Sequence, residues 1–423
     1  MQYVTFRHFF LIIAALFLFL GSSLNAQENK QIPLIKKRDT LSIHIRDTIT
    51  RKTTVPQTDL PQALRSLFNK RPAPATEQFI ITSKPIYSVV PAIGYTLQTK
   101  LAAVLSGNAV FYTDTSARLS AITANATYTQ NKQFYIHAQP NIWIKNNRYN
   151  FVGDIRFYKY PQSTFGLGSG SPRENENPMS YSFLRLYQVV LKQIKNNFFA
   201  GIGYIMDYRW NISEEGTLNG TKSDFRKYGA PSTTISSGAT LNALFDTRDN
   251  SINPAKGFYT SMQLRNNLKA LGSNSNWQSL ILDVRKYIQL PAKSDNVLAF
   301  WSYNWLILSG KPPYLDLPSN GWDSYSSTGR GYIQGRFRGA QMVYLETEYR
   351  FKISANGLFG GVLYANVESF SASPGTLLQQ AQPGFGPGLR IKLNKKSKTN
   401  IGIDYAFGTE GSRGLFITVG ELF

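Results

Sequence analysis

The chain contains no cysteine and only three histidines, and both shortages narrow what it can do. Without a thiol we expect no disulfide framework, no cysteine nucleophile and no lipid anchor on a cysteine. After residues 9–20, no apolar run approaches the roughly 20 residues that a membrane-spanning helix requires. Beyond its first residues, the sequence therefore predicts no transmembrane helix.

The one long apolar run lies at the start of the chain. Arg7 and His8 form a short basic region, residues 9–20 are apolar, and the following residues to Ala26 are small or polar. This order is typical of a secretory signal peptide over residues 1–26, and the run is too short to span a membrane. We expect an exported protein.

Aromatic residues make up 13% of the chain, and the net charge is +21. A chain this basic suggests nucleic-acid binding as one possible function. An exported protein does not meet nucleic acid, however, so we expect no nucleic-acid partner. The basic surface instead suits anionic outer-membrane lipid, including lipopolysaccharide. Composition alone leaves two fold classes open, a large soluble β-protein and an outer-membrane barrel.

The chain divides into a tail and a strand-rich region. Residues 27–85 are basic, rich in proline and poor in periodicity, which favours a mostly extended periplasmic tail with one short helix near residues 60–68. Residues 86–423 alternate apolar and polar side chains with the two-residue period of strands. The expected strands are 86–95, 100–113, 117–130, 133–145, 148–161, 180–195, 197–212, 234–248, 256–269, 276–290, 296–308, 339–352, 357–370, 384–395, 399–408 and 414–423.

This pattern predicts an all-β fold, a transmembrane antiparallel β-barrel of about 16 strands, in the bacterial outer membrane. If the first strand rises from the periplasm, the long connections after strands 5, 7 and 11 all lie outside, as barrels of this class require. The last expected strand ends on Phe423. A terminal aromatic resembles the signal that barrel precursors show to the barrel assembly machinery, which we expect as a partner.

The longest loop carries the most informative residues. Residues 311–339 read KPPYLDLPSNGWDSYSSTGRGYIQGRFRG, and strand 12 follows. They resemble the BamA/TamA family of outer-membrane insertases and translocation pores. The resemblance implies a 16-stranded barrel whose loop between strands 11 and 12 folds into the lumen. The matching residues are the loop tip Arg330, Gly331 and Tyr332, and the Glu-x-Arg of strand 12, Glu348 and Arg350.

A second stretch, LFDTRDNSINPAKGFY, resembles the family's periplasmic turn between strands 8 and 9. By strand parity this turn is periplasmic here too. The residues that match the family's turn motif are Asp246, Arg248, Asp249, Pro254 and Gly257.

An Arg inside a barrel needs an anionic partner, because an unpaired enclosed charge is costly. Alternation places Glu346 and Glu348 on the lumen face of strand 12, where they can receive Arg330. The family also uses an acidic residue on strand 13. Here Asn366 stands at the nearest position, and Glu368 on the same face is the candidate substitute. The alternative is an ordinary salt-bridged loop without a role in transport.

The sequence contains few other residues arranged for catalysis or metal binding. We expect no catalytic, cofactor or metal site and no enzyme activity. His44 and His137 belong to no ligand-spaced cluster. His137 beside Asn141 on one strand face is the only hint of a barrel hydrolase.

The resemblance implies insertion or translocation of proteins or lipids at the outer membrane. Family members usually carry periplasmic POTRA domains that bind clients, but residues 27–85 are too few for more than a remnant. We therefore expect a short member that relies on a separate periplasmic partner. Two alternatives stay open, a structural platform with a permanently closed barrel and a passive pore.

Overall fold

The computed structural model describes residues 55–68 and 85–423, apart from positions 97, 115–116, 145, 293, 374–375, 377 and 396–397. The expected signal peptide (1–26) and most of the expected tail (27–85) lie outside these residues. No helix in the described part of the chain is long and apolar enough to cross a membrane.

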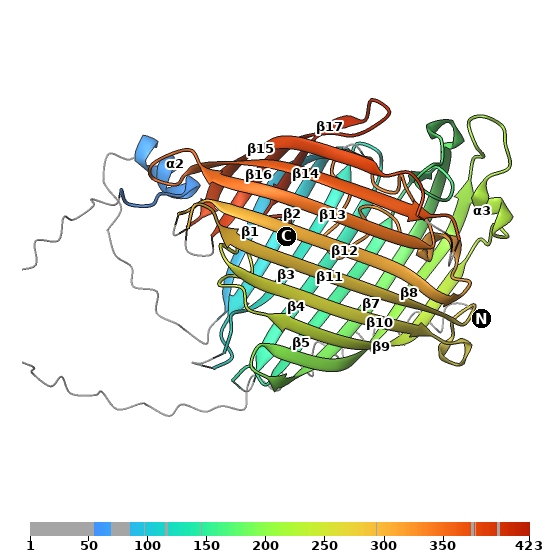
Figure 1. The fold of residues 1–423 in the computed structure, drawn as a ribbon, viewed down its shortest axis with the longest axis horizontal. Coiled ribbons are helices and arrows are strands. Elements are labelled where there is room, and N and C mark those ends of the chain that lie inside the picture. The colour runs from blue at the N-terminus through green and yellow to red at the C-terminus, as the bar shows by residue number, and fades with distance from the viewer. Residues whose placement is uncertain are drawn as a thin grey trace, which may run out of the picture. The chain divides into compact units, whose positions relative to one another are not determined.

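Antiparallel strands dominate the structure, and each pairs with the next along the chain (Figure 1). β5 and the three-residue β6 both pair with β7, so they act as two pieces of one strand. The strands are β1 (Ile86–Thr96), β2 (Lys100–Phe111), β3 (Ser120–Thr129), β4 (Phe134–Ile144), β5 (Tyr149–Lys159), β6 (Gln162–Thr164), β7 (Asn177–Lys195), β8 (Phe198–Glu214), β9 (Thr234–Asp246), β10 (Gly257–Asn267), β11 (Trp277–Gln289), β12 (Val297–Gly310), β13 (Gln341–Lys352), β14 (Phe359–Ser371), β15 (Gln382–Asn394), β16 (Thr399–Phe407) and β17 (Arg413–Val419).

With β5 and β6 counted as one, the chain forms a nearly closed barrel of 16 antiparallel strands, which confirms the predicted fold class. The three longest connections, those after β6, β8 and β12, all lie at the same end of the ring. We call the barrel end with the long connections the loop end, and the other the turn end. A short helix, α3 (Asp224–Lys227), lies in the loop-end connection between β8 and β9.

The two faces of the wall differ, as the strand alternation predicts. In β12, Trp301, Tyr303 and Trp305 are buried and face the lumen, whereas Phe300 and Leu308 on the opposite face are exposed. Large apolar side chains are exposed along the outer face of many other strands. An apolar outer band is the arrangement that lipid requires of a barrel.

The ring closes where β1 meets β17. These two strands lie next to each other. In the described residues, however, no backbone ladder joins them, although every other neighbouring pair has one. β17 has only seven residues, whereas β1 has eleven. Unpaired N–H and C=O groups at this seam make it the weakest line in the wall.

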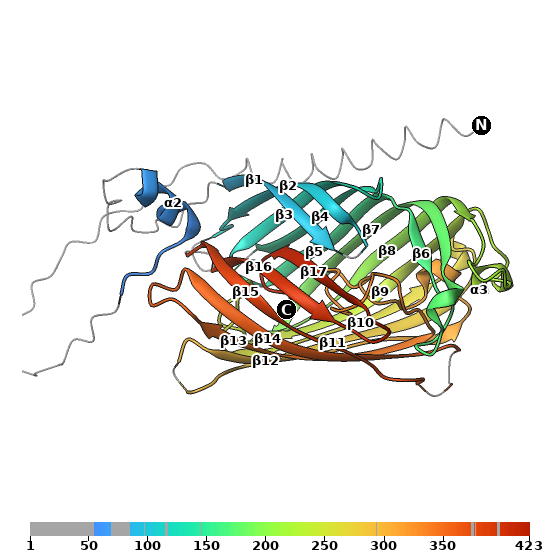
Figure 2. The same ribbon diagram turned by 90° about the horizontal axis from the view of Figure 1, so that it is seen from above.

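The final strand is shorter than the sequence predicts, because β17 ends at Val419 and not at Phe423. Gly420 has a φ of +99°, in the left-handed region that favours glycine, and it ends the strand. Phe423 is buried, and the end of the chain falls inside the outline of the barrel in two perpendicular views (Figures 1 and 2). We call residues 420–423 the inward tail.

Helix α2 (Leu60–Phe68) forms where the sequence indicated a short helix. The residues before it contact the turn end of the barrel. Thr58 N–H donates to the Asn356 carbonyl oxygen at 3.0 Å, and Asp59 accepts from Lys395 N–H at 3.2 Å. The segment therefore rests on the turns that follow β13 and β15, as Figure 2 shows.

Candidate functional site

The connection between β12 and β13, residues 311–340, folds back into the barrel, and we call it the lumen loop. Nearly all of its side chains are buried, and only residues 311 and 324–326 are exposed. A short 3₁₀-helix (Tyr314–Asp316) and a bridge between Ser319 and Arg338 shape it. The inward-folding loop expected between the eleventh and twelfth strands is thus present.

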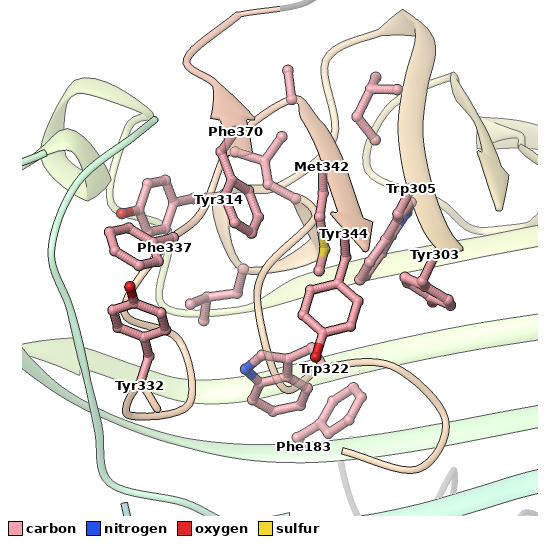
Figure 3. Close-up of a cluster of buried hydrophobic side chains, with 14 of the residues drawn as sticks. Phe183, Tyr303, Trp305, Tyr314, Trp322, Tyr332, Phe337, Met342, Tyr344 and Phe370 are labelled. Carbon is pink, nitrogen blue, oxygen red and sulfur yellow. The ribbon is translucent and has the colours of Figure 1, made fainter. Parts of the chain in front are cut away.

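Aromatic side chains fix the lumen loop to two opposite parts of the wall (Figure 3). Trp322 packs edge-on against Phe183 of β7, with ring centroids 5.8 Å apart. On the other side Phe337 packs between Tyr332 and Phe370 of β14, at 5.1 and 6.1 Å. These contacts leave the loop wedged across the interior and not lying along one strand.

The tip of the loop brings Arg330 against three carboxylates. Its guanidinium contacts Glu346 and Glu348 of β13, the two residues that the sequence predicted. It also donates to Asp404 of β16 at 3.0 Å, a partner that the sequence analysis missed. All four side chains are at least 95% buried, so these are charge-assisted contacts in a shielded site. We call this set the latch.

Two further contacts hold the tip. The ring of Tyr364 lies 3.5 Å from the Arg330 guanidinium carbon, a cation–π arrangement. Asn366 donates from its side-chain amide to the Arg330 main-chain oxygen at 3.0 Å. Asn366, the neutral residue on β14, thus binds the main chain of the loop tip. The acidic residue that the resemblance implied on this strand would instead have bound the Arg330 side chain.

Glu368, the candidate acidic partner of Arg330 on this strand, does not contact the Arg330 guanidinium. Glu368 lies two residues nearer the loop end than Asn366. It stands opposite Tyr344, whereas Asn366 stands opposite Glu346. That offset places the Glu368 carboxyl beside Gly329 and away from the Arg330 guanidinium. Among the described residues, neither of its buried carboxyl oxygens has a hydrogen-bond partner.

Glycines make room for the tip. A Cβ on Gly331 would lie 2.7 Å from the Phe407 main-chain oxygen, and the residue has a φ of +110°. A Cβ on Gly384 of β15 would lie 2.4 Å from the Arg330 main-chain oxygen. The loop backbone therefore approaches the wall more closely than any side chain would allow. Tyr332 turns its hydroxyl to the Pro383 carbonyl oxygen at 2.5 Å.

The latch continues into a larger ionic ring. Arg350 donates to Glu348 at 2.7 Å, and Arg390 donates to Asp404 at 2.5 Å. Glu421 of the inward tail lies between these two arginines, 2.9 Å from Arg390 and 3.9 Å from Arg350. The charges alternate around a closed circuit in the order Arg330, Glu348, Arg350, Glu421, Arg390 and Asp404.

The opposite wall also holds the lumen loop through charged groups that the sequence did not single out. Arg209 of β8 pairs with Asp316 of the loop, and both are buried. Arg156 of β5 donates to the main-chain oxygens of Asp323 and Ser324, each at 3.2 Å. The loop is therefore bound by arginines from the far wall and by acids from the near wall.

The turn motif between β9 and β10 forms one compact unit. Asp246 receives two hydrogen bonds from the Arg248 guanidinium, at 3.0 and 2.9 Å, while Asp249 accepts from Ala255 and Lys256 main-chain N–H groups. Burial alone would lower the pKa of Arg248, but its contact with Asp246 raises that pKa above the ordinary value. The remaining motif residues are the buried Pro254 and Gly257, whose φ is +117°.

This turn is also tied to a neighbouring part of the turn end. Arg118, from the connection between β2 and β3, donates to Asn197 at 3.0 Å and to the Asp246 main-chain oxygen at 3.3 Å. Its guanidinium stacks over the Trp143 ring at 4.8 Å. The motif therefore braces strands that lie far apart in the sequence. The described residues include no cluster suited to a metal ion.

The model of the Omp85 superfamily domain matches residues 106–413 of the chain. The chain belongs to the Omp85 superfamily. That result confirms the resemblance to BamA-type barrels inferred from the loop and turn motifs. No curated protein matches the chain significantly.

Two solved structures resemble this Omp85 chain in fold. One is BamA from Haemophilus ducreyi lacking POTRA domains 1–3, at 12% identity and a TM-score of 0.53, over 80% of this chain and 70% of that one. The other is CdiB from Acinetobacter baumannii, at 10% identity and a TM-score of 0.51, over 79% of this chain and 59% of that one. At such identities the likeness establishes the fold alone.

The turn motif of this Omp85 barrel gives a first prediction. Asp246→Asn should destabilise the protein by about 1–3 kcal/mol, because the largely buried Arg248 guanidinium and the partly buried Arg118 guanidinium lose their carboxylate. The measurement is the urea midpoint of unfolding in detergent, followed by heat-modifiable gel migration. Asp295→Asn is the matched control, since its exposed carboxylate pairs with the exposed Lys352 on the surface, and it should change stability by less than about 0.5 kcal/mol. Equal effects of the two variants would contradict a bracing role.

Proposed function

We propose that this Omp85 barrel lies in the bacterial outer membrane and inserts or translocates proteins or lipids there, through the seam between β1 and β17. The observation that carries the proposal is the seam itself, where the described residues form no backbone ladder. A wall that must open sideways needs one line with few hydrogen bonds to break. The family to which the chain belongs supports the same role.

The filled interior weighs against the passive pore. The lumen loop is buried against both walls, so ions and solutes meet packed side chains where a porin has water. Transport by this barrel would therefore use the wall and not the lumen axis.

The platform function has one observation in its favour. The segment before α2 is hydrogen-bonded to the turn end, and Leu64 on that helix is 45% exposed. A separate periplasmic partner would bind there. It would deliver clients if the seam opens, whereas a platform with a permanently closed barrel would only hold it. Further partners in this proposal are outer-membrane lipid, including lipopolysaccharide, and the barrel assembly machinery for the protein's own insertion. The proposal includes no enzyme activity and no cofactor.

Reconstitution tests the proposed function. The full chain is placed in liposomes, and a urea-unfolded outer-membrane barrel is added as the client. We expect the client to become protease-resistant several-fold faster than in empty liposomes or in liposomes with an unrelated closed barrel. A rate equal to that of the unrelated barrel would reject insertion of proteins and leave the platform function.

A further inference from the structure

A polar cavity of about 230 Å³ lies at the loop end, where three connections of the chain meet. These are the connection from β6 to β7, the connection from β8 to β9 that contains α3, and the start of the lumen loop. Figure 2 shows β6 and α3 together at this end of the barrel. The long connections of an outer-membrane barrel face the cell exterior, so a ligand of this cavity would come from the cell surface.

The lining of the cavity consists mainly of polar side chains. Thr164, Asn177 and Ser223 form a buried floor together with Tyr314, whereas Lys222 at the rim is exposed. Among the described residues that form the lining, none is alanine, valine, leucine, isoleucine, methionine or proline. Sites for drug-sized ligands measure about 300–1,000 Å³ and are mostly apolar. This cavity therefore suits a smaller and strongly polar ligand.

Hydrogen bonds within the protein fix the walls of the cavity. Ser223 donates to Glu214 at 2.7 Å, and Asn177 donates to the same carboxylate. The hydroxyls of Tyr314 and Thr164 lie 2.7 Å apart, and since a hydroxyl oxygen has two lone pairs, this pair can still accept hydrogen bonds from a ligand. The cavity is thus preformed, and a ligand would bind without the cost of ordering these side chains.

One cation at the rim remains without a carboxylate. Lys227 pairs with Asp224 at 2.7 Å, so these two charges neutralise each other. Lys222 lines the same cavity, and no salt bridge to it is found in the described part of the chain. A ligand with one negative group and several hydroxyl groups would therefore match the cavity in charge, polarity and size.

We propose that this cavity binds one acidic sugar unit of a cell-surface glycan, with Lys222 contacting its carboxylate or phosphate and the polar floor contacting its hydroxyl groups. The sources of such a unit are the core of lipopolysaccharide and a free acidic polysaccharide. An acidic peptide would bring the charge but not the ring of hydroxyl groups that the floor can bind. The cavity shares no residue with the seam or the latch, so the inference goes beyond the proposed function.

The test measures sugar binding to the full chain in a sugar-free detergent, lauryldimethylamine oxide, by saturation-transfer difference NMR. The acidic probes are glucuronate, which occurs in acidic polysaccharides, and ketodeoxyoctulosonate, the acidic sugar of the lipopolysaccharide core. At least one of them should bind saturably with a Kd of about 1 mM, as suits so small a ligand. Methyl glucoside and acetate should bind at least about tenfold more weakly. The acidic sugar that binds more tightly identifies the source.

Variants at the rim separate a specific site from general surface charge. Lys222→Gln should weaken binding of the acidic sugar by about tenfold, because the charged contact is lost. Lys269→Gln is the matched control, since it removes an exposed lysine at the same end of the barrel but outside the cavity. Thr221→Trp places a bulky ring at the exposed rim and should abolish binding, whereas Leu218→Trp, in the same connection but outside the lining, should not.

Heat-modifiable gel migration checks that each variant is folded. Absence of saturable binding of both acidic sugars would overturn the inference, and so would equal weakening by Lys222→Gln and Lys269→Gln. Acetate or a tetraglutamate peptide that binds as tightly as the sugars would overturn it as well, since the cavity would then recognise charge alone. None of these outcomes affects the proposed function, because the assay contains neither a client nor a membrane.

Discussion

Arg330→Met is expected to lower the free energy of unfolding by about 3–5 kcal/mol, since it removes the cation that the buried Glu346 contacts and one of the two cations that Glu348 and Asp404 each contact. Glu346, Glu348 and Asp404 converge on this one guanidinium, and none of the three is exposed at its side chain. Methionine keeps the length of the side chain, so the effect reports the charge and not a cavity. The measurement is the urea denaturation midpoint in detergent, by tryptophan fluorescence.

Glu410→Gln serves as the matched control for the latch. Glu410 pairs with Arg336 near the loop end, but its side chain is 45% exposed, so the loss should stay below about 1 kcal/mol. A double variant, Arg330→Met with Glu346→Gln, should recover part of the lost stability by removing the charge that Arg330 neutralises. A loss of less than about 1 kcal/mol for Arg330→Met would contradict the latch as a structural lock.

Replacing residues 319–338 by a short glycine-serine linker should convert the barrel into an open channel. A 16-stranded barrel without its filling loop leaves an aqueous passage, so conductance in planar bilayers should rise by about tenfold or more over the intact protein. The change removes Trp322, Phe337 and Arg330 together, while the wall strands keep their ladders.

The control for this deletion is Trp322→Ala alone, which loosens the loop against Phe183 but leaves the latch in place. It should produce brief openings and not a steady conductance. A high, steady conductance of the unaltered protein would show that the lumen loop does not fill the pore in a membrane.

The sequence predicted the fold well because strand periodicity and turn parity are local signals. Every expected strand has a counterpart, and the bounds mostly differ by a few residues. The last strand is the exception. Its alternation continues through residues 420–423, but Gly420 turns the chain into the lumen, and periodicity alone does not show where a strand leaves its sheet.

The latch was predictable in part for the same reason. Alternation put Glu346 and Glu348 on the lumen face, and the loop motif supplied Arg330. Asp404 carried a usable signal too, since it shares the lumen face of β16 with Asn400 and Gly402. What sequence lacks is the distance across the lumen, so it does not reveal that β16 faces the tip while Glu368 falls beside Gly329.

The contacts between the far wall and the lumen loop could not be predicted from the sequence. Arg209 and Asp316 are more than a hundred residues apart, and neither belongs to a motif. Their pairing depends on how deeply the lumen loop enters the barrel, which is set by aromatic packing around Trp322. The ionic ring through Glu421 depends likewise on the inward tail.

The seam between β1 and β17 should open during client insertion. The chain has no native cysteine, so one cysteine at Val89 in β1 and one scanned through residues 415–418 in β17 can form a single engineered disulfide. Client insertion in liposomes is then compared for the oxidised and reduced forms of the same sample. Oxidation should reduce insertion to the rate of empty liposomes, and reduction should restore it. Undiminished insertion by the fully oxidised barrel would contradict opening of this seam.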